Sequence, residues 1–460
     1  MNFNLVDHLL AERAPMLSSD IAARFCVSAS TVWRAAQAAG ARVAQWREGR
    51  LSYLAATRAP FLVPVRRITK NGGVENLPPL VPLASGGVRW INWKGEPCMF
   101  DGLPPDIAHV RPQGFLGRAF AAQFARDHHL SSNPDGWSDD DVLHMLGEYG
   151  SDLPGDLVLG DAAFERYLAT NPLASAIHAC DLQQSLPRLA QEAMRGEPPG
   201  SSVGGEQPKF TVAALDVSGV LRHMIVKFSP ALDSAPASMR WADLLACEHL
   251  ANVVLQQAGV AASRTQMLEA GGRRFLLSDR FDRVGLGGRM GMISLGAIDD
   301  EYFGARQSTW VGAAYRLEHA SMLEPHAART LAMLYAFGVM IGNGDMHFGN
   351  VSFQPTVEGA GAMRMAPVYD MLPMSYAPVR TELRDIEFAP RLDIPGLSQD
   401  ALRQAFEIAH RYWTECAGST LLSQDFRGIA SANALKLETL AYQSSLVDAQ
   451  AEHTHITGMR

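Results

Sequence analysis

Apolar positions near the start of the chain recur with helical spacing. They predict a helix over 3–13, then a short second helix over 21–25 that the polar residues 18–20 can cap. A tight connection leads into a third helix, which starts at Ser30 and ends at Gly40. Two short helices joined by a turn of this size are typical of a helix-turn-helix.

The helix-turn-helix pattern makes DNA a candidate partner. Residues 43–53 predict a hairpin with its turn at Glu48 and Gly49, which would form a wing. Such motifs meet base edges and phosphates with the first half of their second helix, which places four candidate DNA-binding residues there: Ser28, Ser30, Thr31 and Arg34. The alternative is a small helical bundle that docks onto a protein.

Charge is distributed unevenly and favours DNA over the protein-docking alternative. Residues 1–70 carry ten Lys and Arg against four Asp and Glu, a net charge of +6, whereas the whole chain has −8 and the remainder therefore −14. An overall isoelectric point near 6.0 argues against a chain that coats nucleic acid along its length. Positive charge confined to one module is what a local phosphate contact requires.

Beyond this module the pattern is mixed. Prolines and glycines cluster over 59–87 and indicate a linker or an irregular, strand-rich start. A strand is predicted over 88–93 and helices over 117–126 and 139–147. The acidic run at 139–141 fits the first turn of a helix better than a metal site.

Composition indicates a globular protein of several domains. The 460 residues are 47% hydrophobic and 19% charged. The longest strongly apolar stretch, 331–341, is too short to cross a membrane, and the N-terminus lacks the pattern of a signal peptide. Five scattered cysteines without CxxC spacing suggest neither a disulfide framework nor a zinc cluster. We expect a cytoplasmic protein with reduced thiols and no membrane partner.

Candidate chemistry begins with a glycine-rich segment, 201–210, that could bring backbone N–H groups close to a phosphate. An apolar strand follows with Lys227 inside it, and lysine is seldom buried without a partner. Glu248 lies in a helix predicted over 241–257 and could form an ion pair with that lysine. A hairpin loop, an edge-strand lysine and a surface glutamate are the simpler structural explanations.

Three further features follow in order. A strand over 275–279 runs into a charged connector, and an apolar helix over 326–341 leads to Asp345 and Asn350 in D-x-x-x-x-N spacing. In phosphoryl transfer, a carboxylate at the first position can orient or accept a hydroxyl proton, and the amide oxygen of the second binds Mg²⁺. Asp370, at a strand end, offers a second acidic ligand. The order of these parts is the order found in protein kinases.

The motifs SVGGEQPK, IVKF, DRFDR, NGDMHFGN and APVYD closely resemble those of the HipA-like serine/threonine kinase family, the toxin component of type II toxin–antitoxin systems. The resemblance is specific over about 200–375 and looser from about 85 to the C-terminus, including RPQGFLGR at 111–118. The N-terminal helix-turn-helix resembles the YjjJ (HipH) variety of the family, in which a DNA-binding segment is fused to the kinase-like body.

The resemblance implies a role for each motif. Asp345 would be the catalytic base, and Asn350 and Asp370 would hold Mg²⁺. Lys227 would contact the phosphates of ATP under a glycine-rich cover. The remaining nucleotide contacts would come from Val203, Gly204, Gly205, Glu206, Gln207, Asp279, Arg280, Phe281, His347, Phe348, Gly349, Asn350 and Asp370. Family members can phosphorylate a serine in the glycine-rich loop, and Ser202 stands at that position. Phosphate there would bring negative charge to a loop that must approach ATP.

One position departs from the family. Gly349 stands where a lysine is usual, which removes a possible phosphate contact. Because Asp345, Asn350, Asp370 and Lys227 are all present, we expect an active kinase.

These observations combine into one prediction. The fold is α+β, a HipA-like kinase fold with an N-terminal winged helix-turn-helix. The expected divisions are a DNA-binding domain over 1–60, a β-containing subdomain and linker over 61–200, a nucleotide-binding part over 201–285, and a helical lobe with the catalytic loop over 286–460. The expected partners are a protein substrate and DNA, with an antitoxin and a homodimer also possible. The rivals are a DNA-binding regulator whose kinase-like body senses nucleotide, and a small-molecule kinase.

Overall fold

The N-terminal module comprises residues 2–56 of the computed structural model, which describes residues 2–59, 62–92, 95–195, 207–233, 235–305, 308–355 and 362–444. Its helices and strands are α1 (Asn2–Ala11), α2 (Ser18–Arg24), α3 (Ala29–Ala39), β1 (Met16–Leu17), β2 (Val43–Glu48) and β3 (Leu51–Ala56). The three helices and the hairpin predicted from sequence are therefore present. The strands form one sheet in the order β1-β3-β2.

The start of α2 differs from the prediction. The helix begins at Ser18, and Leu17 precedes it without a side-chain cap, so residues 18–20 form its first turn. The reason is that Leu17 belongs to β1 and pairs with Tyr53 in β3, which brings the helix directly out of the sheet. Leu5, Leu9 and Val32 then pack in the core of the module.

A second sheet, with five strands, lies in the middle region, residues 62–169, in the order β7-β6-β5-β4-β8. Its strands are β4 (Val63–Ile68), β5 (Val74–Pro82), β6 (Val88–Ile91), β7 (Pro97–Phe100) and β8 (Leu157–Leu159), and its helices are α4 (Pro105–Ala108), α5 (Gly114–Phe124), α6 (Asp139–Tyr149) and α7 (Asp161–Ala169). The segment rich in proline and glycine is thus the start of this sheet. The acidic run opens α6, where Ser138 and Asp141 form a capping box.

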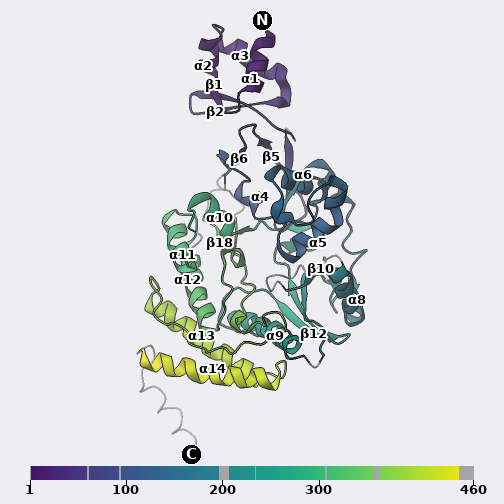
Figure 1. Ribbon diagram of the computed structural model, residues 1–460, viewed down its shortest axis with the longest axis vertical. Helices are drawn as coiled ribbons and strands as arrows, with labels where there is room; N and C mark the ends of the chain where they lie inside the picture. Colours follow the sequence, from purple (N-terminus) through teal and green to yellow (C-terminus); the bar gives the residue numbers. More distant parts are fainter. Residues whose placement is uncertain are drawn as a thin grey trace, which may run out of the picture.

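The N-terminal module is joined to the middle region through Arg58. Its guanidinium pairs with Asp140 at 2.7 Å and donates to the carbonyls of Leu83 and Gly87. Trp46 from the hairpin packs with Val81 of β5 in a small apolar cluster. The module lies at one end of the long axis of the molecule (Figure 1).

The body, residues 207–444, pairs a sheet with a helical part, and one segment, 177–195, leads into it. The sheet order is β12-β13-β11-β10-β9. Its strands are β9 (Ile177–His178), β10 (Lys209–Leu215), β11 (Leu221–Phe228), β12 (Thr265–Ala270) and β13 (Arg273–Asp279), and the flanking helices are α8 (Leu182–Arg195) and α9 (Pro236–Gln257). α9 is buried over much of its length, including the polar side chains of Arg240, Asp243 and Glu248, because β13 and α13 pack against it.

The helical part follows β13 in the chain. Its last helices, α13 and α14, lie at the end of the molecule opposite the N-terminal module (Figure 1). Its helices are α10 (Leu295–Tyr302), α11 (Trp310–His319), α12 (Pro325–Met340), α13 (Gln399–Gly418) and α14 (Gln424–Gln443), and its short strands are β14 (Arg283–Val284), β15 (Gly288–Arg289), β16 (Ile293–Ser294), β17 (Ser352–Gln354) and β18 (Arg364–Met365). Trp310, Phe337 and Trp413 belong to its large apolar core. Within the described ranges, every helix is too short or too polar to cross a bilayer.

A half-buried carboxyl in α4, that of Asp106, makes the stability of the fold sensitive to pH. Burial, followed by the nearby Asp156, raises the pKa of Asp106 to about 6. Between pH values of about 4 and 6 the folded protein therefore keeps a proton that the unfolded chain releases, and stability falls as the pH rises through this window.

We expect Asp106→Asn to remove this loss, so that the variant is more stable than the native protein at pH 7 by up to about 2 kcal/mol and similar to it at pH 4. Thermal unfolding at a series of pH values checks this. Asp135→Asn, in an exposed turn, is the control, and an unchanged profile for Asp106→Asn would contradict the assignment.

Candidate functional site

The centre of the site is a buried lysine between two carboxylates. Lys227 lies on β11, 7% exposed, with Val226 and Phe228 beside it in the apolar core of the sheet. Its Nζ lies 2.6 and 2.7 Å from the two carboxylate oxygens of Glu248 on α9 and forms an ion pair with Asp370. The predicted pairing of Lys227 with Glu248 is therefore confirmed.

The charges of this cluster depend on one another. Burial by itself disfavours the ammonium form, but Asp370 and Glu248 together raise the pKa of Lys227 above its ordinary value. Burial would likewise raise the pKa of Asp370, but Lys227 and then Lys209 outweigh it and hold that pKa at about 2. The lysine and Asp370 are thus both charged at neutral pH, in a place where an unpaired charge would be costly.

Lys209 is a member of this site that sequence reasoning missed. It lies on β10 directly opposite Lys227 in the sheet register and is the second positive charge acting on Asp370. The available signal was its place at the end of the glycine-rich motif, two residues after Gln207. Val203, Gly204, Gly205, Glu206 and Ser202 lie outside the described residues. The side-chain nitrogen of Gln207 is buried and bonds to no other described residue.

The loop after α12 carries Asp345 and holds it through its own main chain. Gly342 takes a positive φ of 72° and turns the chain out of the helix. Asn343, 4% exposed, accepts a hydrogen bond from the N–H of Asp345 at 3.0 Å, and the amide of Asn350 donates to the carbonyl of Asp345 at 2.8 Å. The carboxylate of Asp345 is 54% exposed. The first and last residues of the D-x-x-x-x-N motif are therefore bonded to each other through the main chain of Asp345, and the Asp345 carboxylate remains exposed to solvent.

The residues between Asp345 and Asn350 have distinct surroundings. The ring of His347 accepts the N–H of Gly349 at Nδ1, 3.0 Å away, and its Nε2 lies 4.0 Å from Asp345 Oδ1. Phe348 is buried in the apolar core of the helical part. A Cβ at position 349 would meet the His347 ring at 2.8 Å, so this ring position requires the glycine.

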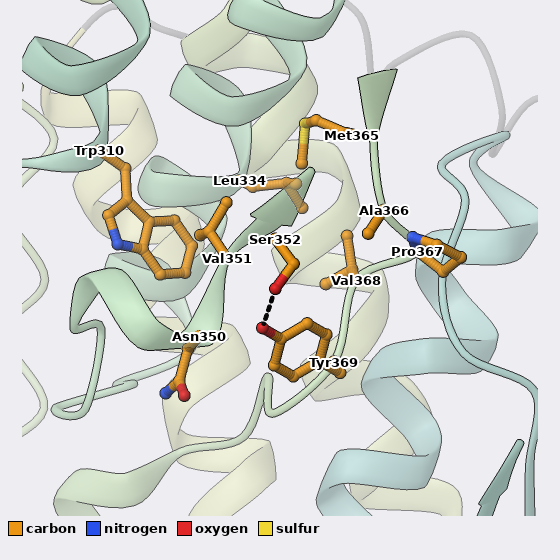
Figure 2. A pocket seen from close by; sticks show the side chains of 10 residues that line it. All are labelled: Trp310, Leu334, Asn350, Val351, Ser352, Met365, Ala366, Pro367, Val368 and Tyr369. Carbon is orange, nitrogen blue, oxygen red and sulfur yellow. Dashed lines mark hydrogen bonds between the residues drawn. The ribbon is translucent and has the colours of Figure 1, made fainter. Parts of the chain in front are cut away.

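Tyr369 links this loop to Asp370. Its hydroxyl donates to the carbonyl of Gly349 at 2.9 Å and bonds to the hydroxyl of Ser352 at 2.8 Å. Figure 2 shows this bond beside a small pocket whose lining includes Asn350, Ser352 and Tyr369. Asp370 itself has a positive φ of 55°, a conformation that is uncommon outside glycine and is frequent at functional sites.

The connector candidates Asp279, Arg280 and Phe281 are also close to the site. The carboxylate of Asp279 accepts from Arg222 at 2.9 Å, and Arg280 pairs with Asp152 and Asp282. The Phe281 ring lies 5.9 Å from that of Tyr369. The two charged side chains are thus occupied by ion pairs, and the aromatic one reaches the loop of Asp370.

The DNA-binding candidates lie on α3, and part of their polar capacity is already used. The hydroxyl of Ser28 caps the helix by accepting the N–H of Thr31 at 3.2 Å, and it bonds to the hydroxyls of Ser30 and Thr31. Arg34 is exposed. The sequence reasoning missed Trp33, which is 58% exposed on the same helix.

Comparison with protein families assigns two parts of the chain. Residues 60–168 match the model of the YjjJ-like toxin, middle domain, and residues 201–431 match the model of the HipA-like C-terminal domain. Among curated proteins, the chain is 32% identical over 434 residues to Toxin YjjJ of Escherichia coli strain K12, which covers 93% of this chain and 95% of the relative.

Among solved structures, the HipA of Shewanella oneidensis MR-1, solved as a complex of HipA, HipB and operator DNA, matches with a TM-score of 0.50. The sequence identity is 16%, and the match covers 74% of this chain and 85% of that one. The similarity to the Helicobacter pylori proinflammatory kinase CtkA covers 55% of this chain and 97% of that one at 15% identity, and its TM-score of 0.37 is too low to establish a shared fold.

The body thus has the fold of HipA, attached to a middle region that is characteristic of the YjjJ type. The chain belongs to the HipA-like toxin family and, within it, to the YjjJ-like toxins.

Proposed function

We propose that this protein is an ATP- and Mg²⁺-dependent serine/threonine kinase of the toxin type that also binds DNA through its N-terminal module. One observation carries the kinase proposal. A buried strand lysine, Lys227, pairs with a helix glutamate and with Asp370, and Tyr369 connects that aspartate to the loop of Asp345 and Asn350. This is the set of groups that phosphoryl transfer needs, held in the order that kinases use.

The proposed roles follow from the surroundings of each side chain. The exposed Asp345 carboxylate would accept the proton of the substrate hydroxyl as that oxygen attacks the γ-phosphorus of ATP and ADP leaves. Lys227 and Lys209 would balance the negative charge of the phosphates. The glycine-rich segment 203–207 would cover them, and residues 279–281 and 347–350 would complete the nucleotide contacts.

Mg²⁺ would be held by Asn350 and Asp370. The residues fit this ion, because the nitrogen of the Asn350 amide is engaged with Asp345, which leaves its oxygen as a ligand, and because Asp370 is charged. When bound, Mg²⁺ would neutralise charge on the phosphates.

We propose that the protein substrate binds with its hydroxyl next to the exposed carboxylate of Asp345. The Shewanella relative was solved together with HipB and operator DNA. On that likeness we extend the proposal to a separate antitoxin partner, and the pairing of DNA half-sites by helix-turn-helix proteins favours a homodimer. We also propose that Ser202 is a site of autophosphorylation.

The decisive test is Asp345→Asn. Without a carboxylate to accept the hydroxyl proton, phosphate transfer is expected to fall by at least about 100-fold, while the fold stays intact because the side chain is exposed. Mass spectrometry of protein incubated with Mg²⁺-ATP measures phosphate at Ser202, and ³²P incorporation measures transfer to protein. Asp385→Asn, an exposed carboxylate outside the loop, is the matched control.

The outcomes separate this proposal from its rivals. Undiminished incorporation by Asp345→Asn would contradict the site assignment. ATP binding without transfer in the native protein would favour the nucleotide-sensing regulator, and phosphate found only on a sugar or drug would favour the small-molecule kinase.

The buried cluster makes a second prediction. Lys227→Met leaves Glu248 and Asp370 without their cation, so the free energy of unfolding is expected to fall by about 3–5 kcal/mol. In Lys227→Met/Glu248→Gln one of the uncompensated charges is gone, and part of the stability is expected to return. Both variants are expected to lose ATP affinity, because the phosphate contact is absent from both. Urea unfolding and isothermal titration with ATP measure the two effects, with Lys436→Met on the exposed face of α14 as control. Equal stability of the two variants would argue against charge pairing as the cause.

The DNA proposal is supported by the charge and shape of the N-terminal module. Three helices are followed by an antiparallel hairpin, the arrangement of a winged helix-turn-helix, and residues 2–56 hold six Lys and Arg against four Asp and Glu, a net charge of +2. Ser30, Trp33 and Arg34 are exposed on α3, and Arg47 and Arg50 are exposed at the tip of the hairpin. We assign α3 to the major groove and the hairpin arginines to phosphates.

A salt titration tests this assignment. If Arg47 and Arg50 each neutralise one phosphate, Arg47→Ala and Arg50→Ala should each reduce the slope of log affinity against log salt by about 0.9. Arg34→Ala is expected to reduce affinity as well, and Trp33→Ala to reduce discrimination between sequences. Fluorescence anisotropy with labelled duplex DNA at several KCl concentrations gives these values. Arg126→Ala, exposed in the middle region, should leave the slope unchanged, and a native slope in both hairpin variants would refute the wing contacts.

A further inference from the structure

A compact group of charged side chains joins the middle region to the connector that follows β13, residues 280–283. Arg280 and Arg283 of this connector are 7% and 5% exposed, and both reach Asp152, in the loop between α6 and β8. Arg280 Nη1 lies 2.9 Å from Asp152 Oδ2, and Arg283 Nη2 lies 2.7 Å from Asp152 Oδ1. Two buried guanidinium groups therefore share one carboxylate that comes from another part of the fold.

Asp282 completes the group from the connector itself. It accepts from Arg280 at 3.0 Å and from Arg283 at 2.7 Å, and its carboxylate also accepts the N–H of Gly155 at 3.0 Å. Burial would raise the pKa of Asp282, but the two arginines outweigh it and hold that pKa at about 2. Two arginines and two aspartates thus meet in this group, and the buried guanidinium of Arg289 adds a positive charge nearby.

Arg283 also holds the main chain of the middle region. Arg283 donates to the carbonyl of Leu153 at 2.6 Å and to that of Gly155 at 2.9 Å. A little further along, the N–H of Arg289 donates to the carbonyl of Thr69 at 3.1 Å, next to β4. The connector is therefore attached to the middle region by hydrogen bonds from its arginines to the Asp152 carboxylate and to backbone carbonyls. These bonds fix its position.

The connector borders the proposed nucleotide site on its other side. The N–H of Arg280 donates to the carbonyl of His223 on β11 at 2.8 Å, and the N–H of Asp279 donates to the carbonyl of Arg264 at 2.8 Å. Phe281 faces Tyr369, the neighbour of Asp370. A displacement of the connector would thus be felt at the residues proposed to contact the nucleotide, 279–281.

We propose that Asp152 of the middle region is a positioning residue for the nucleotide site. It neutralises Arg280 and Arg283 and so holds residues 279–281 in the place where they can contact the nucleotide. This inference rests on the proposed function, and it gives the middle region of this protein an indirect part in nucleotide binding, through residues 279–281. The Asp152 side chain is 56% exposed, but the side chains of Arg280 and Arg283 are 7% and 5% exposed. Without Asp152, these two arginines share Asp282 as their carboxylate partner among the described residues, and the connector must shift or take up water to disperse the extra charge.

The test is ATP affinity of the full chain, measured by isothermal titration for the native protein, Asp152→Asn and Asp152→Glu. Because misplacement of binding groups weakens contacts steeply, we expect the dissociation constant for ATP to rise about tenfold in Asp152→Asn. The turnover number for transfer at saturating ATP should stay within about twofold. Asp152→Glu keeps the charge and should recover most of the affinity. Asp161→Asn breaks a surface ion pair with Arg66 in the same region and is the control.

A second readout separates positioning from general stability. Hydrogen exchange of the backbone amides over 276–284 should accelerate in Asp152→Asn more than exchange in α9 or α13. Native ATP affinity in Asp152→Asn would overturn the inference and leave the proposed function standing. A native protein that binds no ATP would overturn both, and the native titration alone reveals that case. If Asp152→Asn does not fold, Asp152→Ser takes its place with the same expected loss of ATP affinity, about tenfold, and native affinity in Asp152→Ser would contradict the inference.

Discussion

The burial of the Lys227 ammonium is the constraint on which the site depends. An ammonium group removed from water needs nearby negative charge, and here the two carboxylates come from different parts of the chain. Glu248 belongs to α9, and Asp370 belongs to the segment that returns from β18. The pairing therefore ties the sheet, its central helix and the helical part together at one point. Any nucleotide that binds there meets charges already fixed in place, so little reorganisation is needed at the moment of reaction.

A second constraint acts on the loops around this point. Loops carry no regular ladder of hydrogen bonds, so side chains must supply the partners. Asn343 does this for the N–H of Asp345, Asn350 for its carbonyl, and Tyr369 for the carbonyl of Gly349. Asp152 holds the connector from outside the body in another way, through ion pairs with the side chains of Arg280 and Arg283. The groups with proposed chemistry are therefore presented by loops whose shape is set by buried amides, a phenol and ion pairs.

Some of this arrangement was predictable from sequence because it is local or ordered. A lysine within an apolar strand needs a negatively charged partner, and a glutamate within an apolar helix can supply it; this reasoning led to the Lys227–Glu248 pair. The D-x-x-x-x-N spacing separately identified Asp345 and Asn350. Lys209 and Asn343 were visible in the motifs but received no role, because their partners are set by strand register and by the packing of Met371. Ser18 was expected to lie in a cap, and instead the pairing of β1 with β3 decided where α2 begins.

The sequence by itself determined the family, the order of the parts and the identity of the charged residues in the site. It also indicated the three helices and the hairpin at the N-terminus, because their periodicity and turn residues are local signals. Only the tertiary structure decided which charges meet. Asp152 and Arg283 are 131 positions apart, and Lys227 and Asp370 are 143 apart. No pattern along the chain encodes such contacts, since they result from how the sheets and helices pack around several separate apolar cores. The sequence motifs thus determine which chemical groups the site contains, and contacts between segments that are remote in sequence determine how those groups are arranged.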